Sequence, residues 1–154
     1  MGFSIGEVVK KTGLSAHTLR YYEKEGLLPF VTKSSSGLRV YTESDLGWLT
    51  MIECLKSSGL QIKEIAQYIK WFQMGDSTLA ERVEMFRKRK AAIEEEMANL
   101  QIVLDKITYK TALYEEALKC GSLDTATNLP KMQKLKKMLF EKPTDFDKIM
   151  DQVG

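Results

Sequence analysis

The sequence predicts a mainly α-helical chain that contains one small β-hairpin. Apolar residues recur at helical spacing over most of the 154 residues, and residues that cap helix N-termini precede these stretches. Only 3 prolines and 10 glycines interrupt them. One loose alternation of polar and apolar residues, around the turn "SSSG", indicates the hairpin. The length suits one medium domain, or a small domain with an appended element.

The N-terminal segment predicts two short helices joined by a tight turn. Ser4 with Glu7 fits a capping box for the first helix, and Gly13 ends that helix. Ser15 can cap a second helix over residues 15–25. Two short helices with such a turn form a helix-turn-helix. The segment "FVTKSSSGLRVYT" then predicts the hairpin, which would be a wing beside these helices.

Two further helices complete the predicted head, residues 1–74. Thr42 with Asp45 caps the third helix, and the fourth begins near Gln61. Apolar residues mark their buried faces at helical spacing: Leu46, Leu49, Ile52 and Leu55 in the third, and Ile62, Ile65, Ile69 and Phe72 in the fourth. The segment "MGDST", residues 74–78, reads as a linker.

The longest periodic segment predicts a dimerisation helix over residues 75–120, begun by a capping box of Thr78 with Glu81. Steps of four and three residues define a seam: Leu79, Val83, Phe86, Lys90, Ile93, Met97, Leu100, Leu104, Ile107, Thr111, Tyr114 and Leu118. Ten of these twelve are apolar or aromatic, which predicts a coiled coil roughly 60 Å long. So narrow a stripe needs a second copy of the chain; the alternative is that it folds back on its own tail.

The predicted tail, residues 121–154, contains the amphipathic stretch "KMQKLKKMLFEK". Pro143 and a last turn with Phe146, Ile149 and Met150 follow it. This tail can pack against the end of the long helix or against the head, and the sequence does not choose.

Composition gives a formal charge of +2, from 23 basic and 21 acidic residues. The basic excess is local: residues 9–42 hold Lys10, Lys11, Arg20, Lys24, Lys33 and Arg39 against Glu23 and Glu25. No apolar run has membrane-spanning length and no signal peptide is visible. Two cysteines, Cys54 and Cys120, cannot form a disulfide framework, so we expect a cytoplasmic protein.

Catalytic motifs do not emerge from the sequence. His17 is the single histidine, and there is no phosphate-binding loop, H-E-x-x-H motif or catalytic triad candidate. We therefore expect a protein that is not an enzyme and that needs no cofactor.

The stretches "FSIGEVVKKTGLSAHTLRYYEKEGLLP" and "GLRVYTESDLGWLTMIECLKSSGLQIKEIAQYI" resemble the DNA-binding head of MerR-type bacterial transcription regulators. The elements R-Y-Y-E, G-L-L-P, R-x-Y and G-x-x-x-x-E-I occur in order over about residues 3–72. The resemblance implies a winged helix-turn-helix head, an antiparallel coiled-coil homodimer and a palindromic promoter in double-stranded DNA. It also implies activation by bending and untwisting that DNA, which realigns promoter elements for RNA polymerase at the bacterial nucleoid.

The expected DNA contacts lie on the second helix and the wing. The second helix of a helix-turn-helix enters the major groove, where its first turn would present Ser15, His17 and Thr18. Arg20 and Tyr21 would follow on the outward side, with Tyr21 donating to a phosphate, whereas Leu19 and Tyr22 would face the core. The resemblance places three wing residues on the flanking backbone: Lys33, Arg39 and Tyr41. The alternatives are that Tyr21 is a plain surface aromatic residue and that Lys33 and Arg39 are ordinary solvated charges.

The effector is the least determined property. The metal-sensing branch of the family uses a cysteine pair beyond the dimer helix, but this chain offers only Cys120 there, so we expect no metal site. By composition alone, Cys54 on the third helix would be a small apolar filler. The chain also resembles the thiol-based, aldehyde- and electrophile-responsive branch (the NmlR/AdhR type), which implies that Cys54 is the sensing thiol. A nearby positive charge would favour the reactive thiolate, and Lys56 and Lys63 are the candidates to supply it. The alternative is another effector at the coil end or at Cys120.

Overall fold

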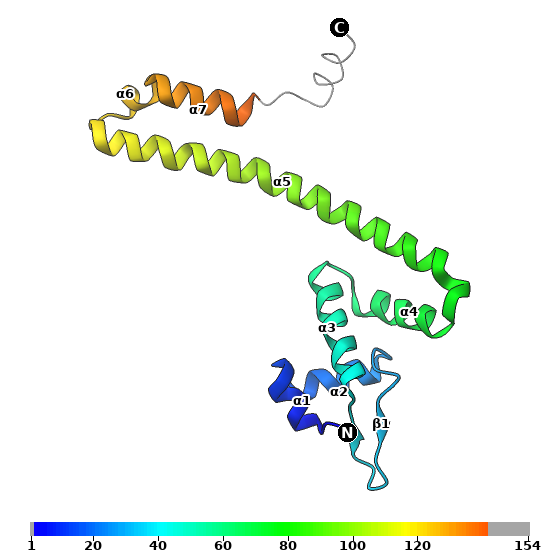
Figure 1. The fold of residues 1–154 in the computed structure, drawn as a ribbon. Helices are drawn as coiled ribbons and strands as arrows, with labels where there is room; N and C mark the ends of the chain where they lie inside the picture. Colours follow the sequence, from blue (N-terminus) through cyan, green and yellow to red (C-terminus); the bar gives the residue numbers. More distant parts are fainter. Residues whose placement is uncertain (1, 142–154) are drawn as a thin grey trace. The chain divides into compact units, whose positions relative to one another are not determined.

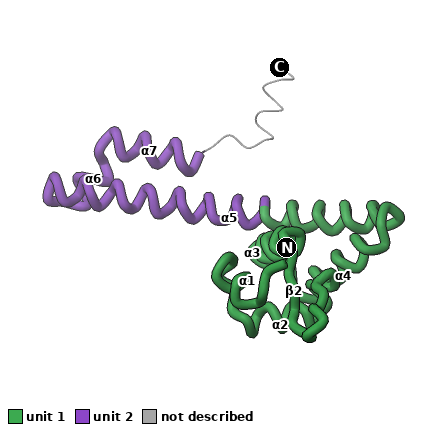
Figure 2. The backbone as a smooth tube through the Cα atoms, turned by 60° about the horizontal axis from the view of Figure 1, so that its bottom comes forward, with its two compact units in different colours: residues 1–93 green, residues 94–154 purple. Residues whose placement is uncertain are grey.

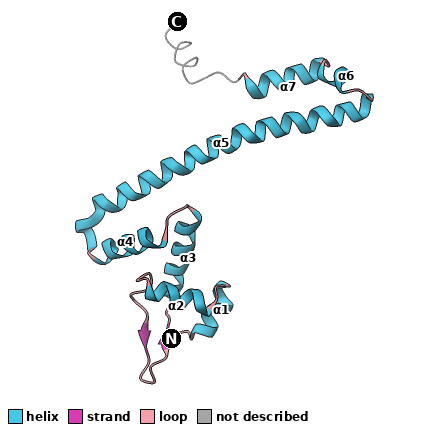
Figure 3. Cartoon of the chain, turned by 180° about the vertical axis from the view of Figure 1, so that it is seen from behind, coloured by secondary structure: helices cyan, strands magenta, loops and turns pink. Residues whose placement is uncertain are grey.

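A computed structural model describes residues 2–141 of the chain (Figure 1). Helices dominate this part of the chain and one antiparallel hairpin accompanies them, so the predicted fold class is confirmed (Figure 3). Two compact units, residues 1–93 and 94–154, divide the chain within its longest helix (Figure 2). The predicted functional boundaries at 74/75 and 120/121 stay predictions. Pro143 and the last turn lie outside the described residues.

Unit 1 begins with the predicted capped helices. Its helices are α1 (Ile5–Thr12), α2 (Ala16–Lys24), α3 (Glu43–Ser57), α4 (Ile62–Gln73) and the start of α5 (Leu79–Cys120). The Ser4 hydroxyl accepts from the Glu7 amide at 3.3 Å, and the Glu7 carboxylate accepts from the Ser4 amide at 2.7 Å. Thr42 and Asp45 form the same reciprocal box at α3, and Ser15 caps α2. These side chains satisfy backbone donors that a helix start leaves free, which fixes where each helix begins.

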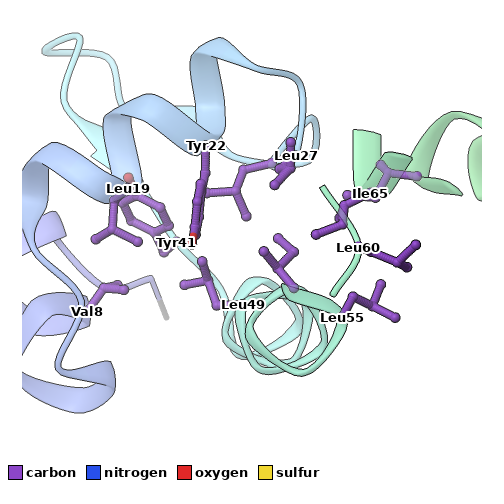
Figure 4. Close-up of a cluster of buried hydrophobic side chains, with 12 residues drawn as sticks. Val8, Leu19, Tyr22, Leu27, Tyr41, Leu49, Leu55, Leu60 and Ile65 are labelled. Carbon is purple, nitrogen blue, oxygen red and sulfur yellow. The ribbon is translucent and has the colours of Figure 1, made fainter. Parts of the chain in front are cut away.

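The core of unit 1 lies between α1, α2, α3 and α4. Figure 4 shows Leu19 and Tyr22 of α2 in one cluster with Val8 of α1 and Leu49 of α3. Leu19 and Tyr22 are buried, as predicted. Burying a large apolar side chain contributes about 1.5–3 kcal/mol, so these contacts hold α2 against the other helices.

The wing is a minimal hairpin. Strands β1 (Thr32–Lys33) and β2 (Arg39–Val40) are antiparallel, with Thr32 opposite Val40. Gly37 has a positive φ of 79° in the turn between them, a conformation that suits glycine because it has no Cβ. Beyond β2 the chain pairs back to the N-terminus, where Phe3 and Tyr41 form a bridge.

The junction between α4 and α5 differs from the sequence prediction. Residues Gly75–Thr78 form a 3-10 turn, η1, rather than an open linker. The predicted capping box at Thr78 is wrong, because its hydroxyl donates back to the Gly75 carbonyl at 3.0 Å and its side chain is buried. The Arg82 guanidinium donates to the same carbonyl at 2.8 Å. The Thr78 hydroxyl also lies 2.5 Å from the Trp71 carbonyl of α4, so these contacts join α4 to α5 through a compact turn.

Unit 2 consists of the C-terminal part of α5 with α6 (Leu123–Thr127) and α7 (Pro130–Phe140). The two short helices fold back along α5 (Figure 1). Their core contains Tyr109, Leu113, Ala126 and Met132. Outside this core, Lys131 pairs with Glu116 at 2.6 Å. The described part of the tail therefore packs against the end of the long helix, the choice that the sequence left open.

The tail covers a different face of α5 from the seam. Tyr109 and Leu113 are buried under α6 and α7. The apolar seam residues of unit 2 remain 54–86% exposed: Met97, Leu100, Leu104, Ile107, Tyr114 and Leu118. In unit 1, Leu79, Val83 and Phe86 are also exposed. Apart from Ile93, which is half-buried, the apolar seam residues thus stay exposed in the described part of a single chain, although the tail does fold back.

Candidate nucleic-acid interface

Helix α2 presents one continuous polar face to solvent. His17, Arg20, Tyr21 and Lys24 are all exposed, and their spacing of three, four and seven residues places them on one side of the helix. Tyr21 is 44% exposed, while its neighbour Tyr22 is buried. The face therefore combines two cations, a phenol and an imidazole, which are groups that donate to phosphate oxygens and base edges.

Lys24 is a member of this face that the sequence interpretation did not single out. Its position seven residues after His17 was the available signal, because that interval returns to the same side of a helix. Lys24 also lies in the last turn of α2. We include it among the candidate contacts to the DNA backbone.

Ser15 and Thr18 carry a structural role at the start of α2. The Ser15 hydroxyl accepts from the Thr18 amide at 3.0 Å, and the two hydroxyl oxygens lie 2.9 Å apart. One proton is used between the two hydroxyls, so the other hydroxyl proton is available to a DNA acceptor. Local capping and a contact to DNA are therefore compatible at this pair.

On the wing, Lys33 and Arg39 have different surroundings. Lys33 of β1 is exposed. Arg39 of β2 instead forms an ion pair with Glu23 of α2, which raises the pKa of the guanidinium. This pair ties the wing to α2, the candidate recognition helix. Arg39 therefore positions the wing through Glu23, and only its remaining donors can reach DNA.

The prediction that Tyr41 contacts DNA is not supported by its position. The side chain is 0% exposed in the core of unit 1, because the chain turns inward after β2 to pair with Phe3. Burial raises the pKa of the Tyr41 phenol. Among residues 2–141 its enclosed hydroxyl has no hydrogen-bond partner. We therefore assign Tyr41 to the core and remove it from the candidate interface.

Tyr41→Phe is expected to leave promoter binding within about twofold of the parent and to raise the free energy of unfolding by about 1 kcal/mol. The reason is that a buried hydroxyl without a partner carries a desolvation cost, which phenylalanine avoids. Chemical denaturation and fluorescence anisotropy with promoter DNA measure the two quantities. Tenfold weaker binding by a folded variant would restore the tyrosine to the interface.

The hydroxyl of Tyr22 reaches beyond the core to α3. It donates to the Glu53 carboxylate at 2.6 Å and accepts from the Lys56 ammonium at 2.7 Å. Burial raises the pKa of Tyr22, and its acceptor role raises the pKa of Lys56. Lys56 is thus directed to Tyr22 and Glu53, which does not support the expectation that it supplies charge to the Cys54 thiol.

Both cysteines are free and exposed. Cys54 lies on the solvent side of α3, between the buried residues Ile52 and Leu55. The interpretation of Cys54 as a buried apolar filler is therefore wrong. Cys120 ends α5, and its sulfur lies 3.2 Å from the Ser122 carbonyl. A thiol has to be accessible in order to meet a reagent in solution, and both cysteines satisfy this requirement.

Two other kinds of site can be assessed over residues 2–141. In this part of the chain, no three His, Cys, Asp or Glu side chains lie close enough together to bind one metal ion. Within the same residues, none of the helices combines the length and apolar character needed to cross a bilayer.

The fold and this polar face define a winged helix-turn-helix DNA-binding protein. Residues 3–70 match the model of the MerR HTH family regulatory proteins, and residues 46–109 match the model described as MerR, DNA binding. A transcriptional regulator of Haemophilus influenzae is 38% identical over 132 residues, which cover 86% of this chain and 97% of the relative. The chain belongs to the MerR family of transcriptional regulators and is not an enzyme.

One further relative and two solved structures are also similar to this chain. AdhR of Bacillus subtilis is 43% identical over 79 residues, 51% of this chain and 56% of AdhR. The crystal structure of HiNmlR, a MerR family regulator lacking the sensor domain, bound to promoter DNA, superposes with a TM-score of 0.70 at 37% identity. That match covers 81% of this chain and 99% of HiNmlR. A MerR family regulator from Listeria monocytogenes gives the same TM-score at 29% identity, covering 92% of this chain and 99% of that one.

Proposed function

We propose that this regulator binds a palindromic promoter as a homodimer and activates transcription by distorting the DNA when thiol-reactive electrophiles, aldehydes in particular, modify Cys54. The protein would act in the cytoplasm at the nucleoid and meet RNA polymerase through the shared promoter. The observation that carries the DNA-binding part is the exposed face of α2, formed by His17, Arg20, Tyr21 and Lys24. HiNmlR, which is similar over nearly its whole length, was crystallised on promoter DNA.

The uncovered seam of α5 supports the homodimer. Apolar residues that recur every three and four residues along a helix are buried by a second helix in a coiled coil. The tail leaves this stripe open, and contiguous exposed apolar surface marks an interaction site. The family resemblance favours an antiparallel pair, which would separate two heads. Few unpaired cations lie on each head, so simultaneous binding by two heads would supply much of the affinity.

Leu104→Lys is expected to shift the protein from dimer to monomer, because it places a charge in the centre of the proposed seam. Sedimentation velocity at micromolar concentration would measure the shift, and promoter affinity should fall at least about tenfold with the loss of avidity. Asn99→Lys is the matched control, since it adds the same charge at an exposed position outside the seam. A parent chain that sediments as a monomer would contradict the proposed dimer.

The palindrome can be tested without knowledge of the natural promoter. Random duplexes of about 40 base pairs would be enriched on the immobilised protein, because two recognition helices related by a two-fold axis select an inverted repeat. We expect one inverted repeat to dominate. Enrichment of an unrepeated half-site, or no enrichment above input, would contradict the proposal.

The proposed chemistry at Cys54 is an addition. A free cysteine is a few per cent thiolate near neutral pH, and the thiolate is the nucleophile. After the thiol proton passes to solvent, the sulfur attacks the aldehyde carbon and forms an S–C bond. The carbonyl π electrons move to oxygen, which takes a proton from water to give a hemithioacetal. No oxidant and no leaving group are required. The exposure of Cys54 supports this assignment.

A second effector site has a specific observation in its favour. In unit 2, a hollow of about 440 Å³ at the end of α5 is lined by Tyr114, Ala117, Leu118, Gly121, Ser122 and Leu123. Cys120 is exposed in the same segment. A small apolar effector at this end of the helix is the alternative to modification of Cys54.

A further inference from the structure

One side-chain hydroxyl joins the recognition helix to the turn of α3 that carries Cys54. The Tyr22 hydroxyl lies 2.6 Å from the Glu53 carboxylate and 2.7 Å from the Lys56 ammonium. Lys56 also lies 3.8 Å from Glu53, and 5.3 Å from the centre of the Tyr22 ring. Cys54 stands between Glu53 and Lys56 in the sequence. One turn of α3 therefore carries the thiol and both partners of Tyr22.

The ring and the hydroxyl of Tyr22 have separate tasks. The ring is buried in the core with Leu19 and Leu49, and a phenylalanine could fill that space. The hydroxyl extends from the core to two charged groups whose side chains are 40% and 41% exposed. Hydrogen bonds to charged groups are stronger than neutral ones. The hydroxyl is therefore a strong and removable connection between α2 and the rim of α3.

One of the two partners on α3, Glu53, borders an open hollow. A hollow of about 380 Å³ between the end of α1 and α3 is lined in part by Lys11, Thr50 and Glu53. Glu53 can turn toward this space without displacing the buried side chains of α3, Ile52 and Leu55. A change near Glu53 and Lys56 can thus break the bonds to Tyr22 while the core remains packed.

We propose that the Tyr22 hydroxyl is the positioning group through which modification of Cys54 changes the orientation of the recognition helix. The inference rests on the proposed response of Cys54. An adduct adds atoms to the turn between Glu53 and Lys56, and these side chains rearrange around it. Loss of their bonds to Tyr22 leaves α2 held by its apolar contacts and by the ion pair of Glu23 with the wing, without a polar bond to α3, so its face meets the DNA at a different angle.

The test uses the full-length protein with Cys120→Ser, so that one thiol reacts. Iodoacetamide supplies a stable adduct: the Cys54 sulfur forms an S–C bond, iodide leaves, and the thiol proton passes to buffer. Intact mass confirms one adduct per chain. In vitro transcription from the parent's promoter, with modified and unmodified protein, gives a response ratio for each variant. Tyr22→Phe is compared with Tyr21→Phe, which removes a neighbouring hydroxyl outside this network. Lys56→Met tests the same network without altering the core.

We expect the response ratio to fall from about tenfold in the parent to about twofold or less in Tyr22→Phe and Lys56→Met. Tyr21→Phe should keep the parental ratio, whatever its basal level. An unchanged ratio in both network variants would overturn the role of Tyr22 and leave the thiol response standing. A parent that binds its promoter but shows no change after modification would overturn both the response of Cys54 and the relay built on it.

Discussion

Arg20→Ala is expected to weaken promoter binding at least tenfold, which corresponds to about 1.4 kcal/mol, with little change in the midpoint of unfolding. Arg20 is exposed in the middle of the polar face of α2. Among residues 2–141 it takes part in no ion pair, so its removal leaves no buried partner unsatisfied. Its planar group can donate two bonds to one phosphate or one guanine, and alanine loses all of them.

Two comparisons make the Arg20 result specific. Lys70→Ala removes an equal charge from an exposed position of α4 that is not part of the candidate interface, and should bind promoter DNA like the parent. Arg20→Lys keeps the charge but loses the fork; partial recovery would indicate a phosphate contact, and no recovery a base contact. Anisotropy titrations at one fixed salt concentration measure all three variants. If Arg20→Ala binds as tightly as the parent, α2 does not present this face to DNA.

Cys54→Ser is expected to bind the promoter and to lose the transcriptional response to formaldehyde or methylglyoxal. Serine preserves size and polarity at an exposed position of α3, so the fold should be retained. A serine hydroxyl is a far weaker nucleophile than a thiolate near neutral pH, so addition to the carbonyl carbon should become undetectable. A promoter–reporter assay in cells, with intact mass of the purified protein after aldehyde treatment, measures both effects.

Cys120→Ser is the matched control for this result, because it removes the other exposed thiol. We expect it to respond like the parent. A normal response of Cys54→Ser together with a lost response of Cys120→Ser would transfer the effector site to the hollow at the end of α5. If both single variants respond normally, neither thiol alone carries the signal.

Local patterns were sufficient to predict the helix starts and the core of the head. The boxes at Ser4 and Thr42 depend on residues three apart, and the buried positions Leu19 and Tyr22 follow from helical spacing. Helical spacing also places Lys24, seven residues after His17, on the polar face of α2. The uncovered seam of α5 was also predictable, because a heptad pattern is visible along one helix.

Other features depend on contacts that a local pattern does not contain. Strand alternation places Tyr41 on the same side as Arg39, but pairing with the distant Phe3 draws Tyr41 into the core. The sequence does not show whether the Thr78 hydroxyl accepts a hydrogen bond from a backbone amide of α5 or donates one to the preceding turn. In the structure it donates to the Gly75 carbonyl of that turn. The bond from Tyr22 to α3 joins residues 31 positions apart.

The ion pair between Glu23 and Arg39 has a consequence for the conditions under which the promoter stays occupied. A cation that is already paired within the protein neutralises no phosphate, so it releases few counterions from the duplex. Each phosphate that is neutralised makes the plot of log affinity against log salt concentration steeper by about 0.9. Pairing the Arg39 guanidinium of each head with Glu23 therefore makes that slope shallower. Promoter occupancy should therefore fall less steeply with rising potassium concentration than it would if Arg39 were free to contact a phosphate.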